Sequence, residues 1–168
     1  LNVGNIELRQ SWAHSSEHAQ CGSITEFLTS NDKLSSINYS SKSHKVRMVL
    51  DLPESSEALM ASFKSKFRTK VKLPAKKGCT SKSGSSDMLT DFYNVFAINM
   101  RDLGSPVHSR NLFENVLSAF PQSRIFIIEK ESIPLAGGIV IGFKDTLFNP
   151  WASSLKEYSN IRPNTMLY

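Results

Sequence analysis

Apolar residues recur at a helical spacing near the middle of the chain. Leu59, Phe63 and Phe67 follow one another every four positions, which is the spacing of one face of an α-helix. Proline is tolerated in the first helical turn, so Pro53 suits the beginning of this helix. The pattern therefore predicts one amphipathic helix over about residues 53–72.

Two further helical patterns lie in the second half of the chain. Phe92, Phe96 and Met100 form one stripe after Ser86, a residue type that often caps a helix N-terminus. A glycine-serine-proline turn stops this helix, and a third helix is predicted over about residues 109–119. Its inward-facing residues are expected to be Leu112, Phe113, Val116 and Leu117.

Strands are predicted where apolar residues alternate with polar ones or form short β-branched runs. These segments are residues 3–9, 45–52, 124–130, 135–143 and 146–153. The last three are separated by residues 131–134 and 144–145, which are short enough to be hairpin connections. Helices and strands in this order predict an α+β fold in which helices flank a mixed, largely antiparallel sheet.

Two segments are interpreted as connections. Residues 11–43 hold ten serines in 33 positions without a sustained apolar period, which is typical of an insertion or long loop. Pro74 and Gly78 are expected to end the first helix. Residues 78–86 (GCTSKSGSS) are then interpreted as a flexible linker and as the best internal boundary.

Length and composition are those of one globular domain. The chain has 168 residues, of which 40% are hydrophobic and 21% charged. No run of about 18 apolar residues occurs, so no transmembrane helix is expected. Two cysteines cannot form a disulfide scaffold, and the N-terminus shows no signal-peptide pattern, so the expected location is the cytoplasm. The chain begins without methionine and stops inside an apolar stretch, as a single domain or a fragment of a longer chain would.

Positive charge is concentrated in the first half of the chain. Residues 1–84 carry 13 Lys and Arg against 7 Asp and Glu, whereas residues 85–168 carry 7 against 8. Seven of the 20 basic residues fall within residues 64–77, with no acid among them. Such a cluster attracts phosphates on nucleic acid, on a nucleotide cofactor or on anionic lipid, although a solvated helix face is the plain alternative. The phosphate-binding candidates are Lys64, Arg68, Lys70 and Lys72.

Several motif-defined functions are excluded. The sequence contains no Gly-x-Ser-x-Gly elbow, P-loop or dinucleotide fingerprint, which argues against α/β-hydrolases, P-loop NTPases and Rossmann dehydrogenases. His14, His18 and Cys21 have the spacing of one helix face, but no fourth ligand lies near them in the sequence. No metal site is therefore expected.

Three stretches of the chain resemble a known family. They are KFRTKVKLPAKKG, DFYNVFAINMRDLGSPVHSRNLFENVL and LAGGIVIGFKDTLFNPWASSLKEYSNIRPNTMLY. Together they resemble the FemAB-like branch of the GNAT acyltransferase superfamily, in particular the FemAB-related type found beside PEP-CTERM and exosortase systems. The family's Asn-Met-Arg-Asp-Leu-Gly run corresponds to residues 99–104, and its Pro-Trp-Ala-Ser-Ser segment to residues 150–154. The resemblance covers about residues 45–168.

This resemblance implies a GNAT-like domain that transfers an acyl or aminoacyl group to an amine in bacterial cell-envelope or exopolysaccharide biosynthesis. It implies acyl-CoA or aminoacyl-tRNA as the phosphate-bearing donor, an amine-bearing envelope or polysaccharide acceptor, and no metal. The protein would act in the cytoplasm, including peripherally at the inner membrane. The alternative is a non-catalytic module that binds a polyanion, RNA or an anionic surface, through the basic residues of 64–77.

One strand interruption is a candidate reaction centre. Pro150 cannot donate a ladder hydrogen bond and so interrupts the strand at residues 149–151, and Gly137–Gly138 in the preceding strand indicate a bulge or a close approach. Backbone N–H groups that are freed where two strands splay can stabilise an oxyanion. Trp151 suits a core position equally well. The residues expected to line a cleft are Gly138, Trp151, Ser153 and Ser154, the two serines being candidate catalytic residues.

Polar residues also end the helix that precedes this region. Asn99, Arg101 and Asp102 are substrate-binding candidates, since an arginine there can grip a carboxylate or phosphate. Arg101 and Asp102 can equally cap the helix and pair with each other. His108 is a candidate base or a solvated loop residue. The remaining substrate-binding candidates, which flank the expected cleft, are Tyr158 and Asn164.

Overall fold

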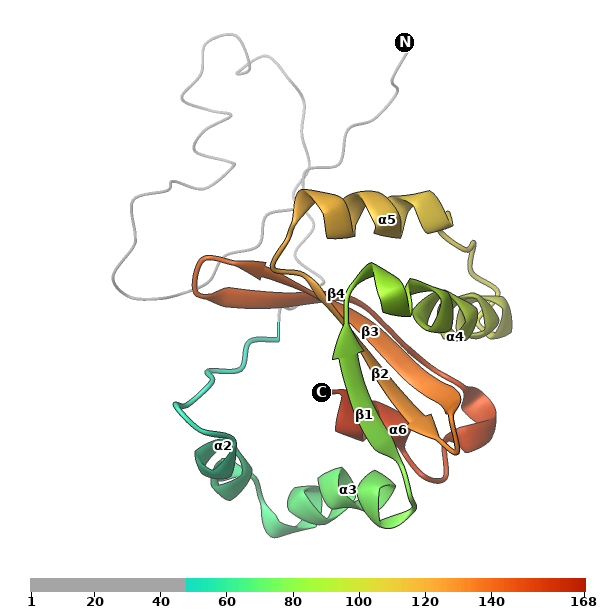
Figure 1. The fold of residues 1–168 in the computed structure, drawn as a ribbon. Coiled ribbons are helices and arrows are strands. Elements are labelled where there is room, and N and C mark those ends of the chain that lie inside the picture. Colours follow the sequence, from blue (N-terminus) through green and yellow to red (C-terminus); the bar gives the residue numbers. More distant parts are fainter. Residues whose placement is uncertain (1–47) are drawn as a thin grey trace, which may run out of the picture. The chain divides into compact units, whose positions relative to one another are not determined.

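The computed structural model describes residues 48–168, of which residues 55–168 belong to one structural unit (Figure 1). No helix in this described part is long and apolar enough to cross a membrane. Its elements in chain order are α2 (Ser56–Ser62), α3 (Ser65–Lys76), β1 (Thr80–Gly84), the 3-10 turn η1 (Ser86–Met88), α4 (Leu89–Asp102), α5 (Arg110–Ala119), β2 (Arg124–Lys130), β3 (Ile133–Phe143), β4 (Thr146–Ser154), the 3-10 turn η2 (Lys156–Tyr158) and α6 (Pro163–Leu167).

Four antiparallel strands form one sheet in the order β1-β2-β3-β4. β2, β3 and β4 lie where the sequence pattern predicts strands, and two-residue turns join them. Glu131 and Ser132, which join β2 to β3, have φ values of 53° and 65°. Such positive values are typical of the tight hairpin turns that match the twist of the strands. The antiparallel sheet with flanking helices confirms the predicted α+β class.

β1 shows that the prediction of a flexible linker over residues 78–86 is wrong. Thr80–Gly84 pairs with β2, although its first four residues are exposed. An edge strand is held by main-chain hydrogen bonds, so it needs no apolar face that a sequence pattern would reveal. An ion pair adds to this pairing, because Nζ of Lys82 lies 2.6 Å from Oε1 of Glu129 on β2.

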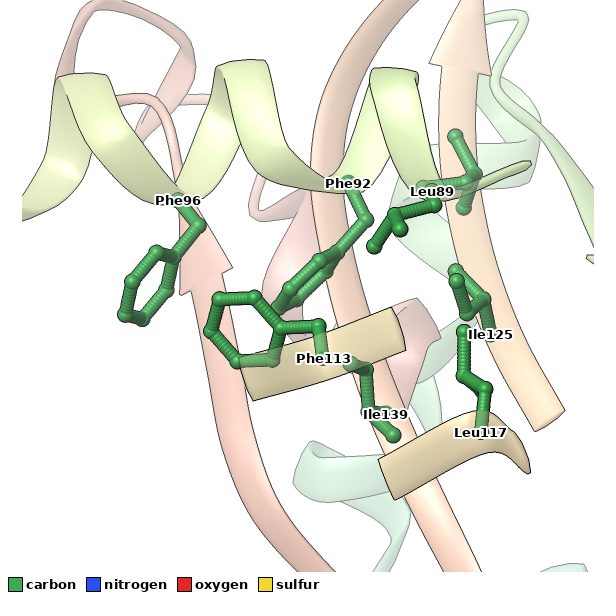
Figure 2. Close-up of a cluster of buried hydrophobic side chains, with 8 residues drawn as sticks. Leu89, Phe92, Phe96, Phe113, Leu117, Ile125 and Ile139 are labelled. Atoms are coloured by element: carbon green, nitrogen blue, oxygen red, sulfur yellow. The ribbon is translucent and has the colours of Figure 1, made fainter. Parts of the chain in front are cut away.

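α4 and α5 cover one face of the sheet, and their apolar side chains meet those of β2 and β3 there (Figure 2). The ring of Phe113 stands edge-on to the rings of Phe92 and Phe96, with centroids 5.2 Å apart in both pairs. Both helices lie where the sequence predicts them, but Leu112, expected to face inward, is 37% exposed. The buried cluster consists of Leu89, Phe92, Phe96, Phe113, Leu117, Ile125, Ile127 and Ile139.

Gly137 allows α4 to lie close to the sheet. A Cβ atom at this position would lie 3.0 Å from Cδ1 of Ile127 and 3.3 Å from Cδ2 of Phe92. Gly137 and Gly138 pair regularly with both neighbouring strands, so these glycines do not form a bulge. Close approach of neighbouring elements is therefore what the two glycines permit.

A second, smaller apolar cluster lies on the opposite face of the sheet, where side chains from η2, α6 and the turn between them cover it. Successive residues of a strand face opposite sides, so Ile127 and Ile128 divide between the two clusters. Burial raises the pKa of the Cys79 thiol, and the positive charge of Lys130 opposes this in part. The buried members of this cluster are Cys79, Ile128, Leu135 and Ala136.

Two helices, α2 and α3, replace the single helix predicted over residues 53–72. The backbone is extended at Phe63, with φ −76° and ψ 144°. Oγ of Ser62 donates to the carbonyl of Leu59 over 2.7 Å, and such a local side-chain bond competes with helix continuation. The apolar residues keep their four-residue spacing across the break, which is why the sequence pattern does not reveal it.

Arg68 of α3 joins the two helices. Its Nη1 donates to the carbonyl of Phe63 over 2.6 Å and to that of Ala61 over 3.3 Å. The last carbonyls of a helix lack N–H partners within the helix. Arg68 therefore caps the end of α2, a structural role beside the predicted phosphate-binding one.

The predictions for the first part of the chain have a mixed outcome. Residues 48–52 form no strand and are exposed, so the strand predicted over residues 45–52 is wrong for that part. Alternation gives a strand only where a neighbour accepts its hydrogen bonds, and none of the four described strands pairs with this segment. The strand predicted over residues 3–9 and the insertion over residues 11–43 lie outside the described residues.

Gly137→Ala is expected to lower the free energy of unfolding by about 1–2 kcal/mol, because the added Cβ crowds Ile127 and Phe92 in a packed core. Urea unfolding followed by circular dichroism measures this change. Gly142→Ala on the same strand is the control, since its Cβ would meet Cβ and Oε1 of Gln122 at 3.3 Å, and this exposed residue lies outside the packed core, so a smaller loss is expected. Equal losses in the two variants would contradict the close-approach explanation.

Arg68→Gln is expected to speed amide hydrogen exchange in α2 by about tenfold, because the charged donor to the end of that helix is lost. Exchange followed by mass spectrometry or NMR over Ser56–Ser62 measures the effect. Lys72→Gln removes the same charge from the same helix and should leave the exchange of α2 unchanged. If both variants behave alike, the capping of α2 by Arg68 is wrong.

Candidate functional site

Asn99 and Ser153, two of the predicted site residues, contact each other directly. Nδ2 of Asn99 in α4 donates to Oγ of Ser153 in β4 over 3.1 Å. Ser153 is buried, with 5% of its surface exposed, and Asn99 is half-buried. Polar groups at this depth cost free energy unless they are hydrogen-bonded, as these are. The bond fixes the end of α4 over the last residues of β4.

β4 carries a bulge a few residues before Ser153. The register shifts between Ile139 and Ile141 of β3, so that Asn149 and Pro150 of β4 together oppose Val140. Pro150 has no N–H, so the hydrogen-bond ladder cannot continue through it. The strand interruption that the sequence predicts at residues 149–151 is therefore present.

Trp151 and His108 extend the core aromatic cluster beside the bulge. The ring of Trp151 stands edge-on to Phe113 at 5.2 Å and lies 6.5 Å from the ring of His108. His108 is stacked on Phe96 at 6.0 Å, and its carbonyl accepts a hydrogen bond from the Tyr93 hydroxyl over 3.1 Å. Trp151 is half-buried and His108 is exposed. Trp151 thus packs on the core and still offers part of its surface beside the bulge.

Strand alternation divides the predicted cleft residues between the two faces of the sheet. Trp151 and Ser153 face α4 and α5, whereas Ser154 faces the side that α6 covers. Tyr158 packs against the second apolar cluster on that side, and Asn164 is exposed in α6. The structure does not bring these last three residues together with the hydrogen-bonded pair.

Gly138 also faces α6. A Cβ atom here would lie 3.2 Å from Nδ2 of Asn149, 3.3 Å from the carbonyl oxygen of Trp151 and 3.4 Å from Cδ2 of Leu167. These atoms already occupy the space around the glycine. Gly138 therefore makes room for its neighbours and does not open a cleft.

Arg101 and Asp102 pair with each other at the end of α4. Nη2 of Arg101 lies 2.9 Å from Oδ1 of Asp102, and 73% of the Arg101 side chain is exposed. Residues two positions apart do not share a helix face, so Arg101 points away from the direction of Asn99. The Arg101–Asp102 pairing that the sequence allows is therefore present, and the Arg101 guanidinium is exposed to solvent, away from the Asn99–Ser153 pair.

The predicted phosphate-binding residues lie in another part of the fold. Three of them belong to α3 and Lys64 directly precedes it; this helix packs on α6 and hence on the sheet face opposite to α4 (Figure 1). Lys64 and Lys72 are exposed and Lys70 is half-buried, whereas the guanidinium of Arg68 is bound to carbonyls of α2. These residues are therefore separate from the Asn99–Ser153 pair.

A shallow hollow of about 640 Å³ also lies away from that pair, at α2 and the first turn of α3. A hydrogen bond from its own backbone N–H, and then one from Ser56, lower the pKa of Glu57 at the rim. Only Arg68 among the predicted site residues borders this hollow. The residues that line the hollow are Ser56, Glu57, Met60, Ala61 and Arg68.

Over residues 48–168, no group of three or more His, Cys, Asp and Glu side chains is placed to hold a metal ion. His14, His18 and Cys21, whose spacing the sequence raised for discussion, lie outside the described residues. The site described above consists of hydrogen-bonding and aromatic groups.

Comparison with known proteins shows what this fold resembles. No protein-family model matches the chain, and no curated protein matches its sequence. A crystal structure of FemX is similar, with a TM-score of 0.60 and 15% sequence identity. The match covers 67% of this chain and 45% of FemX, so the chain spans less than half the length of that protein.

A second structure is a protein of Pyrococcus horikoshii that was provisionally named an acetyltransferase. It is 18% identical with a TM-score of 0.41, and the match covers 49% of this chain and 29% of that one. A TM-score of this size carries no argument.

The likeness to FemX concerns the fold alone, and with the antiparallel sheet and its helices it confirms the GNAT-like α+β fold that the sequence motifs predict.

Proposed function

We propose that this chain is part of an N-acyltransferase that transfers an acyl or aminoacyl group to an amine. The observation that carries the proposal is the bulge at Asn149–Pro150 lying close to the Asn99–Ser153 pair, in a sheet whose fold resembles that of FemX. Bulges are frequent next to active sites, because they interrupt the ladder and re-aim side chains.

The proposed reaction needs few specialised side chains. A neutral amine attacks the carbonyl carbon of a thioester or ester, a C–N bond forms, and the carbonyl electrons move to oxygen. Collapse of this tetrahedral oxyanion breaks the C–S or C–O bond, and the leaving group takes up a proton while the amine loses one. Backbone N–H groups at the bulge would stabilise the oxyanion. His108, exposed beside Trp151, is the candidate that accepts the amine proton.

Asn99 and Ser153 would orient the substrate in this proposal. Their amide and hydroxyl groups are fixed between α4 and β4, so a ligand hydrogen-bonded to them would lie close to the bulge. Holding a donor and an amine in a defined relative position lowers the entropic part of the barrier. Arg101 pairs with the neighbouring Asp102 and 73% of its side chain is exposed, so it could turn its guanidinium to a substrate carboxylate or phosphate.

The donor, the acceptor and the cellular role are proposed from the motif resemblance. Acyl-CoA and aminoacyl-tRNA are the two donors to test, and an amine-bearing envelope or exopolysaccharide precursor is the acceptor. Action in the bacterial cytoplasm or at the inner membrane, in association with a PEP-CTERM and exosortase system, belongs to the same proposal.

A second candidate function is a non-catalytic module that binds a polyanion. The observation that favours it is the position of the α3 lysines, which lie on the other side of the sheet from the Asn99–Ser153 pair. A folded protein that binds phosphates through α3 and transfers no acyl group would have this function.

A transfer assay tests the first proposal. Full-length protein is incubated with radiolabelled acyl-CoA or aminoacyl-tRNA and with amine-bearing envelope sugars or peptides. Asn99→Ala and Ser153→Ala are expected to lower the rate by about tenfold or more, because the substrate loses its anchor. Asn94→Ala, exposed on the same helix, should change the rate by less than about twofold. The absence of labelled product with both donors would contradict the proposal.

A double-mutant cycle tests whether the pair also supports the fold. Asn99→Ala and Ser153→Ala are each expected to lower the free energy of unfolding by about 1 kcal/mol. The double variant should lose less than the sum by about 0.5–1 kcal/mol, because the two residues share one hydrogen bond. Ser154→Ala, on the opposite face, should be additive with Asn99→Ala. Additive losses for Asn99 and Ser153 would mean that they do not interact in solution.

A further inference from the structure

Six lysines in and beside α3 form a cationic surface, and none of them has an ion pair among the residues that the structure describes. No acidic residue occurs between Glu57 and Asp87, so no carboxylate of the same stretch neutralises the surface. Like charges on one helix repel, which favours a partner that carries the opposite charge. The lysines are Lys64, Lys66, Lys70, Lys72, Lys76 and Lys77, all exposed except the half-buried Lys70.

Phe67 adds an apolar point to this surface. It is 43% exposed, and its ring stands edge-on to that of Phe63 with centroids 5.0 Å apart. It is three residues from both Lys64 and Lys70, so it lies beside them along the helix. An exposed phenyl ring flanked by lysines is typical of helices that bind in the headgroup region of a membrane.

The arrangement of α3 leaves this surface free to act independently of the candidate acyl-transfer site. Pro74 is the one buried residue of α3, which packs on α6, whereas five of the six lysines are exposed. The Asn99–Ser153 pair belongs to the opposite face of the sheet. A partner on α3 therefore does not need to approach the bulge in β4, and the inference below does not rest on the proposed reaction.

We propose that the cationic surface of α3 docks on an anionic lipid bilayer through its N-terminal half, with Lys64, Lys66 and Lys70 over the phosphate headgroups and Phe67 at the acyl boundary. Lysines act as mobile point charges and suit phosphates that are not held in one geometry. Each lysine near an anionic membrane surface adds to the attraction, so the three lysines beside Phe67 act together, and the other three add to the positive charge of the helix.

Single-stranded RNA fits this surface less well. RNA-binding surfaces of that kind combine a positive groove with several aromatic side chains on which bases stack. α3 presents a single exposed aromatic ring, that of Phe67, along its basic run. The neighbouring hollow contains Glu57, and the guanidinium of Arg68 there is bound to carbonyls of α2. The charge is therefore spread over a helix surface and not gathered in a groove.

Vesicle co-sedimentation of the 168-residue chain tests the proposal. Binding is expected to vesicles that contain about 30% phosphatidylglycerol and not to vesicles of phosphatidylcholine alone. Lys66→Gln/Lys70→Gln should lower the partition coefficient by roughly 30-fold. The control Arg110→Gln/Lys156→Gln removes two positive charges elsewhere and should lower it by less than about threefold, because those charges lie off the surface. Phe67→Ala should lower it by about fivefold, and this loss should persist at high salt.

Several results would overturn the proposal. Equal binding to the two kinds of vesicle, or no binding to either, would contradict docking on an anionic bilayer. An equal loss in the two double variants would show that only net charge matters. Binding of a fluorescent single-stranded RNA that depends on Lys66 and Lys70, without binding to anionic vesicles, would identify a nucleic-acid surface instead. Circular dichroism of each variant separates these results from a failure to fold.

Discussion

The missing side chain at Gly137 determines how closely α4 lies on the sheet, and the candidate site depends on that close packing. Phe92 occupies the space next to Gly137, and Ser153 pairs with Gly137 across the strands. Asn99 follows Phe92 by seven residues, or about two helical turns, and so shares its face of α4. A larger residue at Gly137 would lift this face and separate Asn99 from Ser153. A polar contact of the site is thus set by apolar packing beneath it.

The bulge in β4 decides which side chains reach this face. The β3–β4 turn pairs Phe143 with Thr146, and an unbroken ladder from there would place Ala152 opposite Gly137. The extra residue at the bulge moves Ser153 into that position. Since a shift of one residue exchanges the two faces of a strand, the bulge brings Ser153 under α4. It therefore does more than interrupt the ladder at Pro150.

The sequence predicts well those elements whose regularly spaced apolar residues are buried in the core. α4, α5 and the strands β2 to β4 bury such residues, and each lies where the pattern places it. β1 is held by main-chain pairing, so it leaves no apolar pattern. The break between α2 and α3 depends on bonds of Ser62 and Arg68 that preserve the apolar spacing. Local hydrogen bonds and edge pairing are therefore what pattern reasoning misses.

The candidate site shows the same division between pattern and geometry. The motifs include both Asn99 and Ser153, but the two residues are 54 positions apart in the sequence. Their contact depends on which face of β4 Ser153 takes, and the bulge determines that face. Sequence reasoning consequently could not separate Ser153 from Ser154, which face opposite sides. It also missed Tyr93 and Phe96 as supports of His108, although their three-residue spacing on α4 is visible in the sequence.

Arg68 illustrates why charge along a sequence is an incomplete guide to charge on a surface. It stands in the middle of the basic run, yet its guanidinium is occupied by carbonyls at the end of α2. Among residues 48–168, the lysines around it show no such bonds, and all but the half-buried Lys70 are exposed. A guanidinium can satisfy two carbonyls in a fixed geometry, whereas an ammonium on a flexible stem is more easily left to water. The basic run is therefore divided by side-chain chemistry into one cation with a structural role, Arg68, and a surface of exposed lysines.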